Sequence, residues 1–174
     1  MIRTLFAFAL VVCQPVHADE PLIARDQIKL KLAGADIVLA GAKQKAETMK
    51  LKVNIAIVDD GGHLLTFARM DGARPASAAT AITKAVTAAT MRLATGTLPP
   101  NAAPDILLNL SLQNAALASG GKITTLSGGV PIVIDGQVVG AIGVGGATGE
   151  QDAQIAKAGI ESLLEAMKEI SSKK

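Results

Sequence analysis

The residue with the widest chemical range in this sequence is His63, which follows Asp59, Asp60 and the pair Gly61-Gly62. An imidazole beside two carboxylates can act as an acid, a base or a metal ligand. A zinc site would need further histidine or cysteine ligands, and no such spacing is present. A serine triad would need a distant nucleophile such as Ser127, which has no elbow motif around it. His63 is therefore a candidate ligand or acid–base group, with a plain strand-start residue beside a turn as the alternative.

A second group of reactive side chains runs from Arg69 to Arg74. It combines two guanidinium groups with the thioether of Met70 and the carboxylate of Asp71, at the expected end of a strand. Arginine pairs well with carboxylates or propionates, so this segment is a candidate pocket. The alternative is an ion pair between Arg69 and Asp71 in a turn. Thr125, in a hydroxyl-rich stretch further along the chain, is a candidate for lining the same cavity.

The glycine-rich segment 143–149 follows an expected strand and opens an expected helix, as a dinucleotide-binding loop would. The third glycine of that pattern would fall on Thr148, however, and no lysine of a nucleotide loop is present. Glu150 and Asp152 occupy the first helical turn, where they would repel an anion. We therefore predict a structural strand-to-helix turn, with an anion or carboxylate site as the alternative.

The elements that position these groups follow from hydrophobic periodicity and turn residues. Helices are expected at 26–50, 76–93, 104–118 and 148–170, the last opened by a capping box of Thr148 and Gln151. Strands are expected at 53–58, 63–70, 130–134 and 137–144, with a short fifth strand near 123–126. Short turns, among them Asp135-Gly136, join the strands in hairpins, so the fold class is α/β of the α+β kind, with a mainly antiparallel sheet.

The first 18 residues have the features of a secretory signal peptide. Arg3 precedes an apolar run at 5–12, and Val16-His17-Ala18 forms a cleavage site before Asp19. The run is too short to span a bilayer. We therefore expect a signal peptide at 1–18, a single domain at 19–174, a periplasmic or secreted location, and no membrane attachment after cleavage. Cleavage would also remove Cys13, and with it disulfide chemistry.

The composition argues against a nucleic-acid partner. The 174 residues contain 17 Lys and Arg against 15 Asp and Glu, no Trp or Tyr, and only three Phe. Nucleic-acid binding usually requires a basic patch and stacking aromatic side chains. A small-molecule ligand is the partner that we expect instead.

The segments taken in order resemble the GlcG/HbpS-like family, whose haem-binding or haem-degrading-type domains include the C-terminal domain of PduO-type proteins. The stretches that carry the resemblance are Ile57–Leu64, Phe67–Ala73, Lys84-Ala85, Gly128–Ile132 and Asp135–Val144. The resemblance implies a profilin-like fold with a five-stranded antiparallel sheet flanked by helices. It also implies assembly into homo-oligomers and, in several relatives, haem binding.

The haem site that the resemblance implies would have an unusual set of ligands here. A relative's histidine on the first helix has no counterpart, because residues 26–50 contain no histidine. Iron coordination would then fall to His63, Met70 or Thr125, and Arg69 or Arg74 would pair with the propionates.

Three functions remain open from the sequence. The leading one is an exported small-molecule-binding protein with haem or a related tetrapyrrole as its ligand. The second is an enzyme acting on a small carboxylate or carbonyl compound, with His63 or Asp60 as the base and Arg69 holding the carboxylate. The third is a non-catalytic oligomeric accessory protein of a periplasmic redox system.

Overall fold

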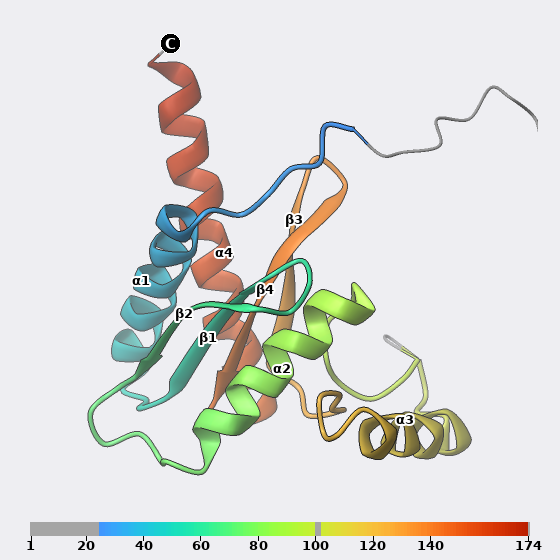
Figure 1. The fold of residues 1–174 in the computed structure, drawn as a ribbon. Helices are drawn as coiled ribbons and strands as arrows, with labels where there is room; N and C mark the ends of the chain where they lie inside the picture. The colour runs from blue at the N-terminus through green and yellow to red at the C-terminus, as the bar shows by residue number, and fades with distance from the viewer. Residues whose placement is uncertain (1–24, 100–101, 174) are drawn as a thin grey trace, which may run out of the picture.

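The computed structural model describes residues 25–99 and 102–173, so the predicted signal peptide at 1–18 lies outside the described residues. Within them, a four-stranded sheet has helices on both faces (Figure 1). The strands are β1 (Asn54–Asp59), β2 (Leu64–Arg69), β3 (Gly129–Ile134) and β4 (Gln137–Gly145). The helices are α1 (Leu32–Thr48), α2 (Ser77–Met91), α3 (Ile106–Ala118) and α4 (Gly149–Ser172). The strand order is β2-β1-β4-β3 and every pairing is antiparallel, which confirms the predicted α+β class.

The prediction of a fifth strand near 123–126 is wrong, because the described residues form four strands and this segment is irregular. Its backbone groups bond to side chains rather than to a neighbouring strand. The amide of Thr124 donates to the hydroxyl of Thr87, and the carbonyl of Leu126 accepts from the hydroxyl of Thr95. These side-chain partners satisfy the polar groups that a sheet ladder would otherwise bond.

Both predicted hairpins are present. Asp135 and Gly136 have φ angles of 48° and 76°, as a tight two-residue turn between β3 and β4 requires. The turn between β1 and β2 is longer and contains Gly62 at a φ of 83°. The pairing of the two strands shifts register between Ile57 and Val58, shortly before this turn on β1. The two hairpins join through the pairing of β1 with β4, which places these strands at the centre of the sheet and β2 and β3 at its edges.

The first and last helices differ from prediction at their ends. The helix expected at 26–50 begins only at Leu32, because the preceding residues run beside the β3–β4 hairpin, where the amide of Ile28 donates to the side chain of Gln137. At α4 the predicted capping box of Thr148 and Gln151 is confirmed, and the helix continues to Ser172. None of the helices in the described ranges combines the length and hydropathy of a membrane span.

The core has two layers, one on each face of the sheet. On one face α1 and α4 pack together over large aliphatic side chains such as Ile55, Ile57 and Ile142, which are fully buried. On the other face α2 presents alanines to β1 and β4. A Cβ at Gly143 would overlap the carbonyl of Ala81, so glycine here lets α2 lie directly on the sheet. This close approach brings the polar side chains of α2 near the end of β4.

Helix α3 stands apart from this core. Asp105 immediately precedes the helix, and its carboxylate caps it by accepting from the amide of Leu108 at 2.9 Å. None of its residues is buried, although five of them are exposed large hydrophobic side chains, namely Ile106, Leu107, Leu108, Leu110 and Leu117. Figure 1 shows this helix at the lower right, on the side of α2 and away from α1 and α4.

Candidate functional site

The structure places the predicted site residues in separate regions. His63 lies in the β1–β2 turn, while Arg69, Met70 and Asp71 line a cavity of about 310 Å³ at the opposite end of β2. Arg74 lines a second cavity, of about 400 Å³, beside α2. The remaining residue, Thr125, lines a third cavity next to α3. The predicted common pocket is therefore not formed by these residues within one chain.

Asp59 organises the β1–β2 turn around His63. One of its carboxylate oxygens accepts from the amides of Gly61 and His63 at 2.9 and 2.8 Å, and the imidazole Nδ1 lies 3.2 Å from both oxygens. Burial alone raises the pKa of Asp59, but the hydrogen bonds from the His63 amide, the His63 ring and the Gly61 amide outweigh it, so the pKa is lowered. The turn thus holds a carboxylate in its charged form against the ring.

The orientation of His63 leaves one ring nitrogen available. The side chain is 83% exposed, and within the described residues only Nδ1 is hydrogen-bonded. A carboxylate on one ring nitrogen fixes the tautomer and makes the other nitrogen, here Nε2, a better ligand. This arrangement is common among metal-binding histidines.

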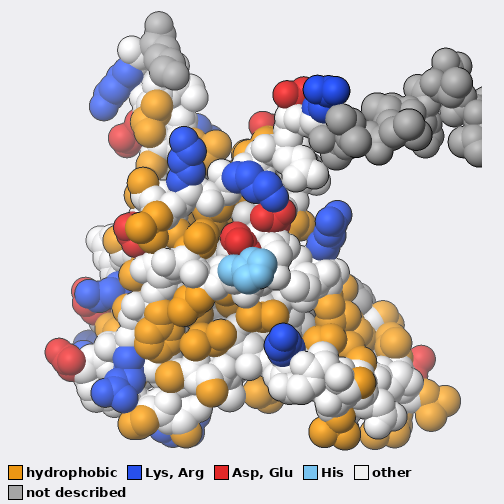
Figure 2. Space-filling model, viewed as in Figure 1, with side chains coloured by type: hydrophobic (Ala, Val, Ile, Leu, Met, Phe, Trp, Pro, Cys, Tyr) orange, Lys and Arg blue, Asp and Glu red, His pale blue; other side chains and the backbone are white. Residues whose placement is uncertain are grey.

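An apolar surface lies beside this histidine, because α2 packs over β1, β4 and β3 but leaves the outer part of β2 uncovered. Leu64 is 49% exposed, and Phe67, Ile82 and Val86 are partly exposed. Figure 2 shows the histidine at the edge of hydrophobic side chains, with acidic and basic groups on its other side.

Two basic residues that the sequence analysis did not single out lie near this turn. Lys29 forms an exposed ion pair with Asp60 at 2.6 Å, and Arg92, the residue after α2, lines a cavity with Asp60. Lys29 precedes α1 and Arg92 follows α2, so only the packing of these helices brings both to the hairpin. No spacing in the sequence could have found them.

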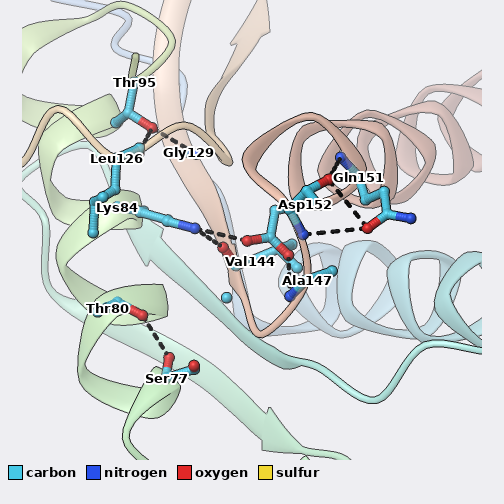
Figure 3. Close-up of polar contacts among 12 residues, drawn as sticks. Ser77, Thr80, Lys84, Thr95, Leu126, Gly129, Val144, Ala147, Gln151 and Asp152 are labelled. Atoms are coloured by element: carbon cyan, nitrogen blue, oxygen red, sulfur yellow. Dashed lines mark hydrogen bonds and ion pairs between the residues drawn. The ribbon is translucent and has the colours of Figure 1, made fainter. Parts of the chain in front are cut away.

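A second polar cluster, which sequence reasoning also missed, is a buried ion pair. Nζ of Lys84 on α2 donates to Asp152 on α4 and to the carbonyl of Val144 on β4, both at 2.8 Å (Figure 3). The other oxygen of Asp152 accepts from the amide of Ala147 at 3.1 Å. Lys84 is 5% exposed and Asp152 is 1% exposed. The acid that we expected to repel anions is therefore paired with a base in the interior.

The segment before β3 closes over this ion pair. Gly128 has a φ of 118°, and a Cβ on it would lie 2.6 Å from Cβ of Asp152 and 3.0 Å from Nζ of Lys84. The hydroxyl of Thr95 holds the segment in place by accepting from the amide of Gly129 and donating to Leu126. A side chain at position 128 would thus push the segment off the ion pair.

A cavity of about 400 Å³ lies against the ion pair, between α2, the segment before β3, and the start of α4. Its polar lining comes from Arg74, Ser77, Thr80, Ser127 and the ion pair itself. The strand-to-helix turn at 145–149 forms one wall, so the turn that we predicted as structural also borders a cavity. Within residues 25–99 and 102–173, no three His, Cys, Asp or Glu side chains are grouped as metal ligands.

The fold of this chain, a four-stranded antiparallel sheet with helices on both faces, is shared with known proteins. The model of the family described as haem-degrading HbpS-like proteins matches residues 30–161. The chain therefore belongs to the HbpS-like family, which confirms the resemblance found in the sequence.

Particular relatives agree with this assignment. The chain is 41% identical over 110 residues to protein GlcG of Escherichia coli, covering 63% of this chain and 76% of that protein. It is similar to a solved HbpS variant from Streptomyces reticuli, with a TM-score of 0.65 and 32% identity over 83% of this chain and 97% of the other. A PduOC structure solved as a haem complex has a TM-score of 0.66 and 29% identity, covering 78% and 95%.

The lowered pKa of Asp59 predicts how the hairpin responds to acid. Because the unfolded state binds this proton more readily, the stabilisation from the carboxylate is fully present above its ordinary value of 3.8 and is lost as the pH falls through the lower folded value. We expect Asp59→Ala to lower the free energy of unfolding at pH 7, and the difference from the wild type to shrink below pH 4. Urea titrations at several pH values measure this difference in the free energy of unfolding. A difference independent of pH would contradict the assignment.

The buried ion pair predicts that substitutions at Lys84 and Asp152 have non-additive effects on the free energy of unfolding. Asp152→Asn leaves the ammonium of Lys84 buried without its counter-charge, so we expect a loss of about 3–5 kcal/mol in the free energy of unfolding. The double variant Lys84→Met with Asp152→Leu removes both charges and should lose less than the sum of its single variants. Lys29→Met at the exposed ion pair is the control, with an expected loss of at most about 1 kcal/mol. Additive losses in urea unfolding would show that the two charges are not coupled.

Proposed function

We propose that this protein binds haem or a related tetrapyrrole at the β1–β2 turn, with His63 as the iron ligand. The description of the family names haem degradation, and the structure of PduOC was solved as a haem complex. The observation that carries the proposal for this chain is the exposed imidazole whose Nδ1 is held by Asp59. A carboxylate in this position strengthens a histidine ligand.

The surroundings of the turn fit such a ligand in two further respects. The partly exposed side chains of Leu64, Phe67 and Val86 offer an apolar surface for a flat macrocycle. Arg92 offers a guanidinium group for a propionate. Haem would supply iron-centred redox or ligand-binding chemistry, while the chain supplies an oriented imidazole, an apolar contact and a cation.

The other predicted haem contacts have less support than His63. Met70 is 8% exposed and packs in the core, and Arg69 lies at the far end of β2 from His63. A six-residue strand is about 17 Å long, so Arg69 is not beside the imidazole. The same separation weighs against the enzyme alternative, which needs His63 or Asp60 and Arg69 on one small substrate.

Self-association is the second part of the proposal. Helix α3 contains no charged residue from Ile106 to Ala118, and its large apolar side chains are exposed. An exposed helix of this kind, with no buried residue, is suited to contact with a second copy of the chain. An accessory role in a redox system would use the same assembly.

Export to the periplasm or the medium is the third part, and it rests on residues 1–18 alone. We propose that the protein works there as a haem-binding component. N-terminal sequencing of protein recovered from the extracytoplasmic fraction tests this location. A first residue other than Asp19 would contradict the proposed cleavage site.

A haem titration followed by the Soret band tests the ligand. We expect His63→Ala to weaken binding at least tenfold by removing the iron ligand, and Asp59→Ala to weaken it about 10–100-fold by releasing the imidazole. Met70→Leu and Thr125→Val are the matched controls, with unchanged spectra expected. Binding that His63→Ala leaves intact would overturn the assignment of the ligand.

Light scattering tests the role of α3. We expect Leu107→Ser with Leu117→Ser to raise the monomer fraction without changing the helix content, because both side chains are at least 76% exposed in a single chain. Ile170→Ser, also at an exposed apolar position but at the end of α4, is the control. An unchanged mass for the double variant would exclude α3 from any interface.

A further inference from the structure

We infer that the cavity between α2 and the start of α4 binds a small carboxylate, at a site separate from the His63 hairpin. Three segments distant in the sequence converge there: residues 74–84, 126–127 and 146–152. Its volume of about 400 Å³ is at the lower end of ordinary ligand pockets, which suits a molecule of a few carbon atoms. The space is therefore matched to a metabolite-sized ligand.

Arg74 is the group that would take the negative charge. Its Nε donates to the hydroxyl of Ser77 at 2.9 Å, which fixes the plane of the guanidinium group at the rim. In the part of the chain that the structure describes, the terminal nitrogens of Arg74 make no hydrogen bond. Two parallel N–H groups on a fixed guanidinium are the usual partner of a carboxylate.

Lys84 offers a second donor from the floor of the cavity. An ammonium group has three N–H bonds, and the described contacts of Lys84 use two of them, to Asp152 and to Val144. The side chain is buried and also lines the cavity. A buried ammonium with an unused N–H is stabilised by a further acceptor.

The charges of the lining favour a monoanion over phosphate. Arg74 and Lys84 contribute two positive charges and Asp152 one negative charge, so the charged lining carries a net charge of +1. A singly charged carboxylate neutralises it, whereas a doubly charged phosphate leaves an excess of negative charge near Asp152. Ser127 and Thr80 add hydroxyls, and Ala76 and Leu126 an apolar wall, for the rest of the molecule.

Calorimetric titration of the full chain with acetate, propionate, lactate and pyruvate tests the inference, with inorganic phosphate and methylammonium as comparison probes. We expect at least one carboxylate to bind more tightly than phosphate, with no binding of methylammonium. Amide chemical shifts should change at 146–149 and at Ser127 rather than at the β1–β2 turn. The titration extends to about 10 mM ligand, which detects even weak binding. If no carboxylate binds in this range, or if phosphate binds more tightly than every carboxylate, the inference fails.

Variants separate this site from the rest of the surface. We expect Arg74→Gln to weaken carboxylate binding about tenfold or more, the value of one charge-assisted hydrogen bond. Arg69→Gln is the matched control, because it removes an exposed arginine from a different cavity. The haem titration should be the same for both variants. Equal carboxylate affinity of Arg74→Gln and the wild type would overturn the assignment, and thermal melting checks that both variants are folded.

Discussion

The rest of the structure depends on the contact between Lys84 and Asp152, which joins three parts of the fold. One ammonium group links α2, the end of β4 and the first turn of α4, because it donates to Asp152 and to the carbonyl of Val144 at the same time. Both charges are buried, so neither is solvated if its partner is removed. Asp152 also accepts from the amide of Ala147, so the ion pair is bonded to the turn that precedes α4.

Close packing makes this ion pair possible. Glycine at position 143 lets the alanine face of α2 lie directly on β4, and glycine at position 128 lets the chain before β3 cross the ion pair. A Cβ at either position would hold the layers apart, and Lys84 would then be open to water. The cavity beside Arg74 is the space that remains where these three segments meet.

The two candidate sites differ in the kind of ligand that they can accept. The hairpin presents an exposed imidazole, oriented by Asp59, next to an apolar surface, which suits a large flat molecule. The cavity is small and is lined by Arg74 and the buried ion pair, which suits a small anion. Their separation means that one site could act without the other.

The sequence by itself determined the elements of this protein: the α+β class, both hairpins, the capping box at Thr148 and Gln151, and the family. These features depend on local patterns, such as hydrophobic period and the positive φ angles of Asp135-Gly136, which neighbouring residues specify. The tertiary structure alone decided that 123–126 is not a strand, that Arg69 is remote from His63, and that Lys84 meets Asp152. Each of these depends on partners far apart in the chain, and 68 residues separate the two charges of the ion pair. Such partners are brought together by the packing of α2 and α4 on the sheet and not by any spacing within the sequence.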